Sequence, residues 1–219
     1  MRLGRYELYR SERQAIDDPL MYMERLDELA GILKGIPWVL AGGLTIPLTL
    51  GAFYRRHYDV DVAFPVEAFP AIEGAMRRAG YYLSTYFPMS WFGRFRFALS
   101  VPVRANGWLV RRRPRKLKFK EKGGGHGPPH LIASIDALPY RITNGRFVTC
   151  DGRFDFPLVR PLVGHHLATP RGHDIACLHL HYVGAIKETI AEPKHSLDLE
   201  VIASGGPAAA QLATRSKPT

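Results

Sequence analysis

Two aspartates, Asp59 and Asp61, have the residue type and spacing that most directly indicate chemistry in this chain of 219 residues. They alternate with Val60 and Val62 in the run 58–64, which has the period of two typical of a β-strand, so both carboxylates should lie on one face. Carboxylates that share a face repel each other unless a cation lies between them, and a hard oxygen donor set favours Mg²⁺. The pair therefore predicts a magnesium site, although Asp-x-Asp pairs also occur on ordinary surface strands.

A glycine pair, Gly42 and Gly43, precedes these aspartates and supplies a second part of such a site. It ends a short apolar run, 38–41, that predicts a buried strand, and a helix is expected to start near Thr45. Glycine lets a ligand approach the backbone because it has no Cβ, and a helix start offers free N–H groups to an anion. The turn is therefore expected to hold the phosphates of a nucleotide beside the magnesium site.

The segment AGGLTIPLTLGAFYRRHYDVDVAF, residues 41–64, resembles the signature of the polymerase-β-like nucleotidyltransferase superfamily. Within it, the pattern Arg55-x-His57-x-Asp59-x-Asp61 is similar to the form found in lincosamide and related antibiotic nucleotidyltransferases and in toxin-type nucleotidyltransferases. The linker between the glycine pair and Asp59 looks like the length used in the lincosamide-type branch. The resemblance covers residues 38–80 most closely.

The resemblance implies an α/β fold, a mixed sheet flanked by helices with a C-terminal helical portion. It implies a metal-dependent transfer of a nucleoside monophosphate from a nucleoside triphosphate such as ATP to an acceptor, with release of pyrophosphate. By this resemblance, Gly42 and Gly43 would hold the triphosphate and Asp59 and Asp61 would hold Mg²⁺. Further along the motif, Arg55 or Arg56 would steady the β- and γ-phosphates, and His57 would act as a positioning group.

The superfamily has a third carboxylate on a later strand. Asp136 is the best match because it lies in the apolar run 132–138, where a buried acid needs a partner or a metal ion. Asp151 and Asp155 are alternatives, but they stand beside Gly152 in what is expected to be a turn.

A last similarity lies near the C-terminus, where Lys194 and Asp198 match the Lys-x-x-x-Asp-Leu helix of many such enzymes. Lys194 could bind a phosphate. It could equally form a surface ion pair with Asp198, four residues later on the same helix face.

The acceptor depends on how the charge is interpreted. The net charge is +10, and the segment 104–122 holds nine basic residues and one acid. Lys116, Lys118 and Lys120 alternate with apolar residues, which predicts one exposed basic strand face that attracts a polyanion such as an RNA end. The short chain and the Arg-x-His-x-Asp-x-Asp form favour a small antibiotic-like acceptor instead. The bland interpretation is a solvated hairpin, and the rival function is a nucleic-acid-binding module without catalysis.

The remaining expectations concern organisation. We expect a catalytic domain over 1–160, a C-terminal helical portion over 161–203, helical from about 173, and a flexible tail over 204–219. Two cysteines cannot form a disulfide framework, and no apolar run is long enough for a membrane span, so a cytoplasmic protein is expected. The sequence leaves the oligomeric state open. The elements expected before residue 161 are helices over 18–34 and 67–79, strands over 38–41, 58–64 and 130–138, extended chain over 81–104 and 108–120, and a hairpin over 146–156.

Overall fold

The fold is described here from a computed structural model, for residues 2–3, 6–8, 19–51, 53–55, 57, 59–91, 95–102, 117–121, 134–190 and 193–205. The helices are α1 (Pro19–Ile32), α2 (Thr45–Leu50), η1 (Val66–Ala68), α3 (Phe69–Arg78), α5 (Leu180–Thr189) and α6 (Pro193–Ser204). The strands are β1 (Arg2–Leu3), β2 (Tyr6–Leu8), β3 (Val39–Ala41), β4 (Val60–Pro65), β5 (Tyr81–Trp91), β6 (Phe95–Pro102), β7 (Leu117–Glu121), β8 (Ser134–Thr143), β9 (Arg146–Thr149), β10 (Asp155–Pro157), β11 (Val163–Ala168) and β12 (Asp174–Leu178).

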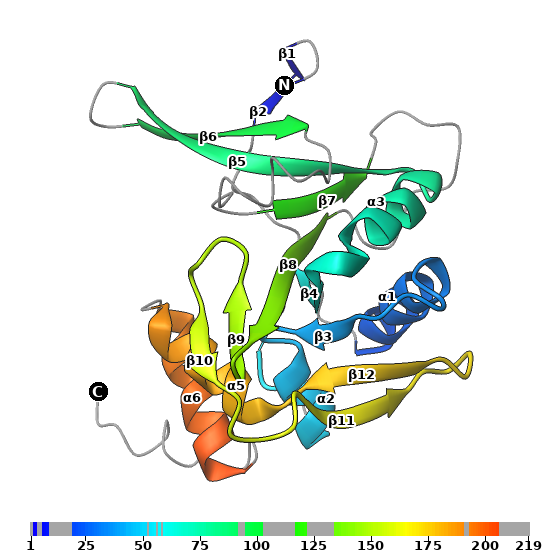
Figure 1. Ribbon diagram of the computed structural model, residues 1–219, viewed down its shortest axis with the longest axis vertical. Helices are drawn as coiled ribbons and strands as arrows, with labels where there is room; N and C mark the ends of the chain where they lie inside the picture. Colours follow the sequence, from blue (N-terminus) through cyan, green and yellow to red (C-terminus); the bar gives the residue numbers. More distant parts are fainter. Residues whose placement is uncertain are drawn as a thin grey trace.

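The described strands form one mixed sheet in the order β1-β2-β6-β5-β7-β8-β4-β3-β12-β11, and β9 and β10 branch from β8 (Figure 1). At its centre, β4 pairs in parallel with β8 and antiparallel with β3. Strand β7 pairs antiparallel with the other edge of β8. The expected α/β class, a mixed sheet flanked by helices, is confirmed.

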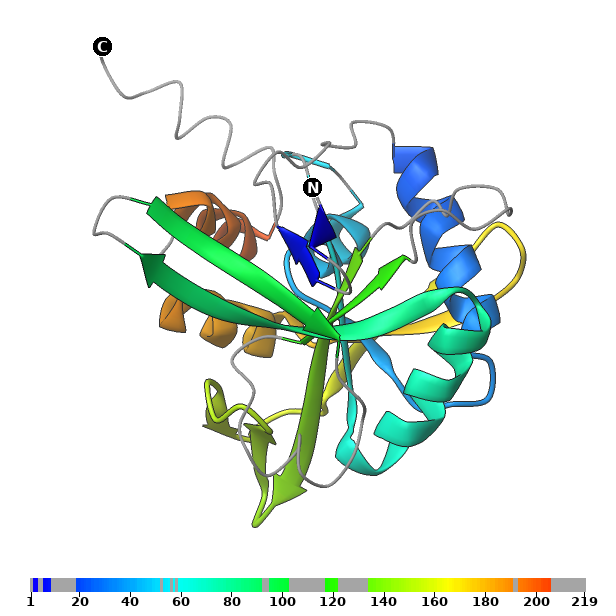
Figure 2. The same cartoon turned by 90° about the horizontal axis from the view of Figure 1, so that it is seen from above.

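Helices cover the two faces of the sheet, with α1 and α3 on one side and α5 and α6 on the other (Figures 1 and 2). Strand β4 shows why the faces differ. Val60, Val62 and Phe64 are buried in the apolar core that includes α1 and α3, whereas Ala63 belongs to the second core, with residues of α5 and α6. Since neighbouring residues of a strand point to opposite faces, Asp61 points to the side of α5 and α6.

The C-terminal part is less helical than the sequence indicated. Residues 163–178 form the hairpin β11–β12, and β12 joins the central sheet in parallel with β3 through the pair Cys177–Leu40. The expected helix over 173–203 therefore begins only at Leu180. The error has a local cause, because the apolar run 175–178 is too short for periodicity to separate a strand from a helix. The division at residue 160 stays a prediction, and residues 206–219 lie outside the described part.

The prediction for β7 was half right. Leu117 and Phe119 enter the core on the side of α1 and α3, so the expected alternation is present. The opposite face is not wet, however, because Lys118 is 2% exposed and Lys120 is 8% exposed. The predicted exposed face of three lysines is therefore wrong for these two. Residues 104–116, which include Lys116, and residue 122 lie outside the described residues.

No helix in the described ranges is both long enough and apolar enough to span a membrane.

Candidate active site

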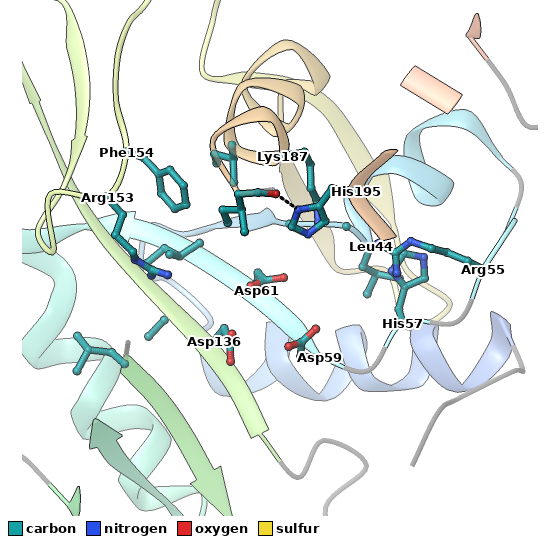
Figure 3. Close-up of a pocket in the computed structure, with 17 residues that line it drawn as sticks. Leu44, Arg55, His57, Asp59, Asp61, Asp136, Arg153, Phe154, Lys187 and His195 are labelled. Carbon is teal, nitrogen blue, oxygen red and sulfur yellow. Dashed lines mark hydrogen bonds between the residues drawn. The ribbon is translucent and has the colours of Figure 1, made fainter. Parts of the chain in front are cut away.

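Three carboxylates come together in one cleft beside the centre of the sheet (Figure 3). Asp59 lies just before β4, Asp61 lies on β4, and Asp136 lies on β8. The register of the parallel pair places Asp61 directly beside Asp136, on strands that are about 4.8 Å apart. The cleft is open to solvent, and its cavity volume is about 110 Å³.

The two alternative aspartates are engaged elsewhere. Asp151 accepts a hydrogen bond of 2.6 Å from the hydroxyl of Thr149 and pairs with Arg153. Asp155 pairs with Arg146 at 2.7 Å on the protein surface. Neither aspartate lines the cleft, so the structure brings Asp136, and not its rivals, beside Asp59 and Asp61. That Asp136 acts as a metal ligand stays a prediction.

The glycine pair is shaped by its neighbours. Gly42 has a φ of +71°, and a Cβ at this position would overlap the carboxylate of Asp61. At Gly43 a Cβ would overlap the guanidinium of Arg55 and would lie 3.4 Å from both His57 Nδ1 and Lys187 Nζ. Glycine is therefore required at position 42, whereas a side chain at position 43 would have to displace the guanidinium of Arg55. Three nitrogen-bearing side chains surround Gly43.

The predicted helix start contributes less than expected. Helix α2 has only six residues, and the N–H groups of Thr45 and Ile46 already donate to the carbonyls of Gly42 and Gly43, at 3.3 Å each. Positive charge near the glycine pair comes instead from side chains, above all from Arg55 and Lys187.

A buried ionic network holds these side chains. Asp198, on α6, is 0% exposed. Arg55 donates two hydrogen bonds to its carboxylate, Nε to Oδ1 at 2.6 Å and Nη2 to Oδ2 at 2.7 Å. The hydroxyl of Tyr54 donates a third, at 2.8 Å, and Lys187 Nζ lies 3.2 Å from Oδ2. Burial alone would raise the pKa of Asp198, but the hydrogen bonds and charge of Arg55, together with the charge of Lys187, lower it.

This network corrects one interpretation of the C-terminal motif and limits another. Asp198 is no part of a surface pair, because its carboxylate is buried against Arg55 and Lys187. Lys194 lies on α6, but its side chain is outside the described ones, so its phosphate role stays a prediction. Arg55 lines the cleft as expected, yet two of its nitrogens bind Asp198. Whether it also binds a phosphate remains a prediction, and Arg56 lies outside the described residues.

His57 is a neutral group at this end of the cleft. It is buried, and burial, followed by the nearby charge of Arg55, lowers its pKa to about 3. Its backbone is fixed by Tyr22, whose hydroxyl donates to the His57 carbonyl and accepts from its N–H, both at 2.9 Å. The rings of Phe53 and Tyr54 pack edge-on against it. A neutral, clamped imidazole fits the predicted positioning role, which stays a prediction.

Sequence reasoning missed two lysines at the site. Lys118 contacts the carboxylate of Asp136, and its Nζ lies 3.8 Å from Asp59 Oδ2. The alternation of β7 gave a signal for Lys118, since it showed a polar face without showing that the face meets the aspartates. Lys187 gave no local signal, because only the packing of α5 against the glycine turn brings it there. Among the described residues, no group of three or more His, Cys, Asp or Glu side chains is arranged as a metal site.

The opposite end of the cleft is built differently (Figure 3). Arg153 and Phe154 lie there, with the guanidinium carbon 5.3 Å from the ring centroid. This end therefore offers an aromatic ring and a guanidinium, and it lies apart from Arg55. His195 lies instead beside Lys187 (Figure 3); it is buried, and its Nδ1 lies 2.6 Å from the carbonyl oxygen of Ile190.

The glycine turn and the three aspartates lie on a mixed sheet, the arrangement that the resemblance to nucleotidyltransferases implies. Comparison with known proteins gives a family match for part of the chain. Residues 24–103 match the model of the aminoglycoside-2''-adenylyltransferase family, a segment that contains Gly42, Gly43, Asp59 and Asp61. No curated protein matches the chain in sequence.

A solved structure extends the likeness in fold to most of the chain. The lincomycin-bound lincosamide antibiotic adenylyltransferase LnuA is 12% identical, with a TM-score of 0.50, over 83% of this chain and 96% of that one. ANT(2'')-Ia in complex with adenylyl-2''-tobramycin is 14% identical, with a TM-score of 0.44, over 90% of this chain and 97% of that one. The family model thus bears out the resemblance to antibiotic nucleotidyltransferases over residues 24–103, and the LnuA structure bears out the fold over most of the chain.

Proposed function

We propose that this protein transfers a nucleoside monophosphate, with adenylate as the first candidate, from a nucleoside triphosphate to a hydroxyl group of a small antibiotic-like molecule. The observation that carries the proposal is the single cleft that joins Asp59, Asp61 and Asp136 to the glycine pair. The match to an adenylyltransferase family over residues 24–103, which include the glycine pair, Asp59 and Asp61, supports ATP as the co-substrate. Because nucleoside triphosphates are intracellular compounds, the reaction is placed in the cytoplasm.

The residues around Gly43 fit the triphosphate. Because Gly43 has no Cβ, the guanidinium of Arg55 can lie against the backbone there, with Lys187 Nζ close by, so two cations stand beside the turn where an anion would bind. Lys187 carries a compact charge, and Arg55 is fixed in place by Asp198. These two cations would bind phosphate oxygens and favour the charge of the leaving pyrophosphate.

The three aspartates fit Mg²⁺ by the chemistry of their donors. All are carboxylates, the ligands that this hard cation prefers, and two of them are direct neighbours across β4 and β8. Asp59, Asp61 and Asp136 would hold the ion. When bound, the ion would neutralise charge on the reacting phosphate and lower the pKa of the acceptor hydroxyl.

The far end of the cleft fits the acceptor. Phe154 offers packing surface and Arg153 offers a polar contact there, and Ile186 and Ile190 add apolar surface along the cleft. The sequence argument for an RNA end came from the nine basic residues of segment 104–122. Two of them, Lys118 and Lys120, are buried and so cannot contact a polyanion, and the other seven lie outside the described residues. A small acceptor is therefore the better proposal.

The test is a transfer assay. The protein is incubated with Mg²⁺, each α-labelled nucleoside triphosphate in turn, and separate panels of lincosamides, aminoglycosides and total RNA. We expect label from ATP on a small acceptor and none on RNA. Asp61→Asn should abolish transfer and leave the melting temperature nearly unchanged, whereas Asp155→Asn, a surface aspartate outside the cleft, should retain activity. Transfer by the Asp61→Asn protein would refute the mechanism, and a label found only on RNA would refute the choice of acceptor.

A further inference from the structure

A buried ammonium group lies within the carboxylate cluster. Lys118 is 2% exposed, contacts Asp136, and places its Nζ 3.8 Å from Asp59 Oδ2. The strand registers explain the position, because Asp61 pairs with Asp136 across β4 and β8, and Asp136 pairs with Lys118 across β8 and β7. The backbone of three neighbouring strands thus places this lysine in the same row as two of the aspartates.

Burial of this ammonium requires compensation. An ion removed from water costs several kcal/mol unless opposite charges lie against it, so a lysine at this depth indicates a negatively charged surrounding. Lys118 forms its ion pairs with Asp59 and Asp136, which are both carboxylates of the cluster. The lysine therefore uses the same oxygens that a metal ion would use.

The charges of the cluster can be balanced. At neutral pH aspartate side chains carry one negative charge and a lysine one positive charge. Three aspartates and Lys118 together leave two negative charges, which a single divalent ion neutralises. A site with three carboxylates and no lysine would instead attract more than one divalent ion, as two-metal sites do.

We propose that Lys118 is a fixed cation of the carboxylate cluster, which holds Asp59 and Asp136 in place and limits the free protein to one divalent ion at this site. The inference rests on the proposed function for its metal ligands. By this inference Lys118, on β7, is a positioning residue that affects metal binding through the carboxylates of Asp59 and Asp136.

The test measures metal binding without nucleotide. Purified full-length protein is titrated with Mn²⁺, and free Mn²⁺ is followed by electron paramagnetic resonance. The wild type should bind one Mn²⁺ per chain at the cluster. Lys118→Met should bind a second ion, or the first one about tenfold to a hundredfold more tightly, the usual range for coupling between two competing ligands. Lys120→Met is the matched control, because Lys120 is also buried on β7 but pairs in register with Ser134, and its Mn²⁺ binding should equal that of the wild type.

Thermal unfolding gives a second measurement. In EDTA, Lys118→Met should melt below the wild type because its carboxylates repel each other, and added Mg²⁺ should raise its melting temperature more than that of the wild type. If Lys118→Met fails to fold, Lys118→Arg, which keeps the charge, should bind metal like the wild type, and Lys118→Gln should behave as described for Met.

The inference is overturned if Lys118→Met or Lys118→Gln binds Mn²⁺ with the stoichiometry and affinity of the wild type, if the wild type binds two ions, or if no variant binds any. Failure of the proposed function is seen separately, in the transfer assay. If the wild type transfers no nucleotide but Lys118→Met still differs from it in Mn²⁺ binding, the role of Lys118 stands and the proposed reaction is wrong. If the wild type transfers nucleotide but the two proteins bind Mn²⁺ alike, the reaction stands and the role of Lys118 is wrong.

Discussion

The substitution Asp198→Asn tests how much of the stability depends on the buried ionic network. Asp198 is fully buried, accepts three hydrogen bonds from Arg55 and Tyr54, and pairs with Lys187 at 3.2 Å. The amide removes the negative charge and leaves two cations buried without their partner. Breaking a buried pair in this way costs about 3–5 kcal/mol, which for a chain of this size lowers the melting temperature by about 6–20 °C.

A surface pair of the same chemistry supplies the control. Asp155 pairs with Arg146 Nε at 2.7 Å, almost the 2.6 Å of the Asp198 pair with Arg55, but its side chain is 52% exposed. Asp155→Asn should therefore cost about 0–1 kcal/mol. The measurement is the free energy of unfolding from urea titration of both variants and the wild type. If the two variants lose equal stability, burial does not decide the value of these pairs and the reasoning is wrong.

The stability lost in Asp198→Asn should depend on pH in a defined way. The pKa of Asp198 is lowered in the folded state, so the carboxylate contributes stability that is fully present above its unfolded pKa of about 3.9 and is lost as the pH falls through the folded value. The difference in unfolding free energy between the wild type and Asp198→Asn should thus be constant from neutral pH to about pH 4 and shrink below it. A difference that shrinks already between pH 7 and pH 5 would contradict the lowered pKa.

Two further predictions concern the glycine turn and its lysine. Gly42→Ala should reduce transfer strongly, because the added Cβ overlaps the Asp61 carboxylate. The control is Gly51→Ala, which has a similar φ of +75° and no atom within 4 Å of the added Cβ, so it should lose only about 1 kcal/mol of stability and keep its activity. Equal activities of the two variants would show that the overlap at Gly42 is harmless. Lys187→Met should weaken nucleotide binding by about tenfold to a hundredfold, because one charge-assisted contact is lost. The Mn²⁺ affinity of the free protein should change little. If a fluorescence titration gives an unchanged nucleotide affinity, Lys187 is not part of the phosphate site.

Local pattern was sufficient for the parts of the site that lie within one element. Asp59 and Asp61 could be placed on a common face because a period of two needs only neighbouring residues. The apolar run around Asp136 showed that this acid is buried, and the family resemblance gave it a place in the sheet. The predicted class, the mixed sheet and the early helices follow from the same kind of information.

The errors arise where partners are distant in sequence. Lys118 was assigned to an exposed face because its strand has one polar side, but the register that puts this side against Asp136 joins residues 18 positions apart. Asp198 was interpreted through Lys194, four residues away, whereas its real partner Arg55 is 143 positions away. Periodicity shows that a face is polar and cannot show which other element will cover it.

The ionic network also bears on how the C-terminal portion relates to the catalytic part. A boundary at residue 160 would separate Lys187 and Asp198 from Arg55 and Gly43, which they contact or adjoin. It would also remove β12 from its place beside β3, the strand that leads into the glycine turn. The aspartates come from the sheet, whereas a cation next to Gly43 comes from α5 and the anion that fixes Arg55 comes from α6. The helices after residue 179 therefore form one wall of the cleft, and a fragment that ends at residue 160 would expose Arg55 without its counter-charge and lack half of the proposed triphosphate site.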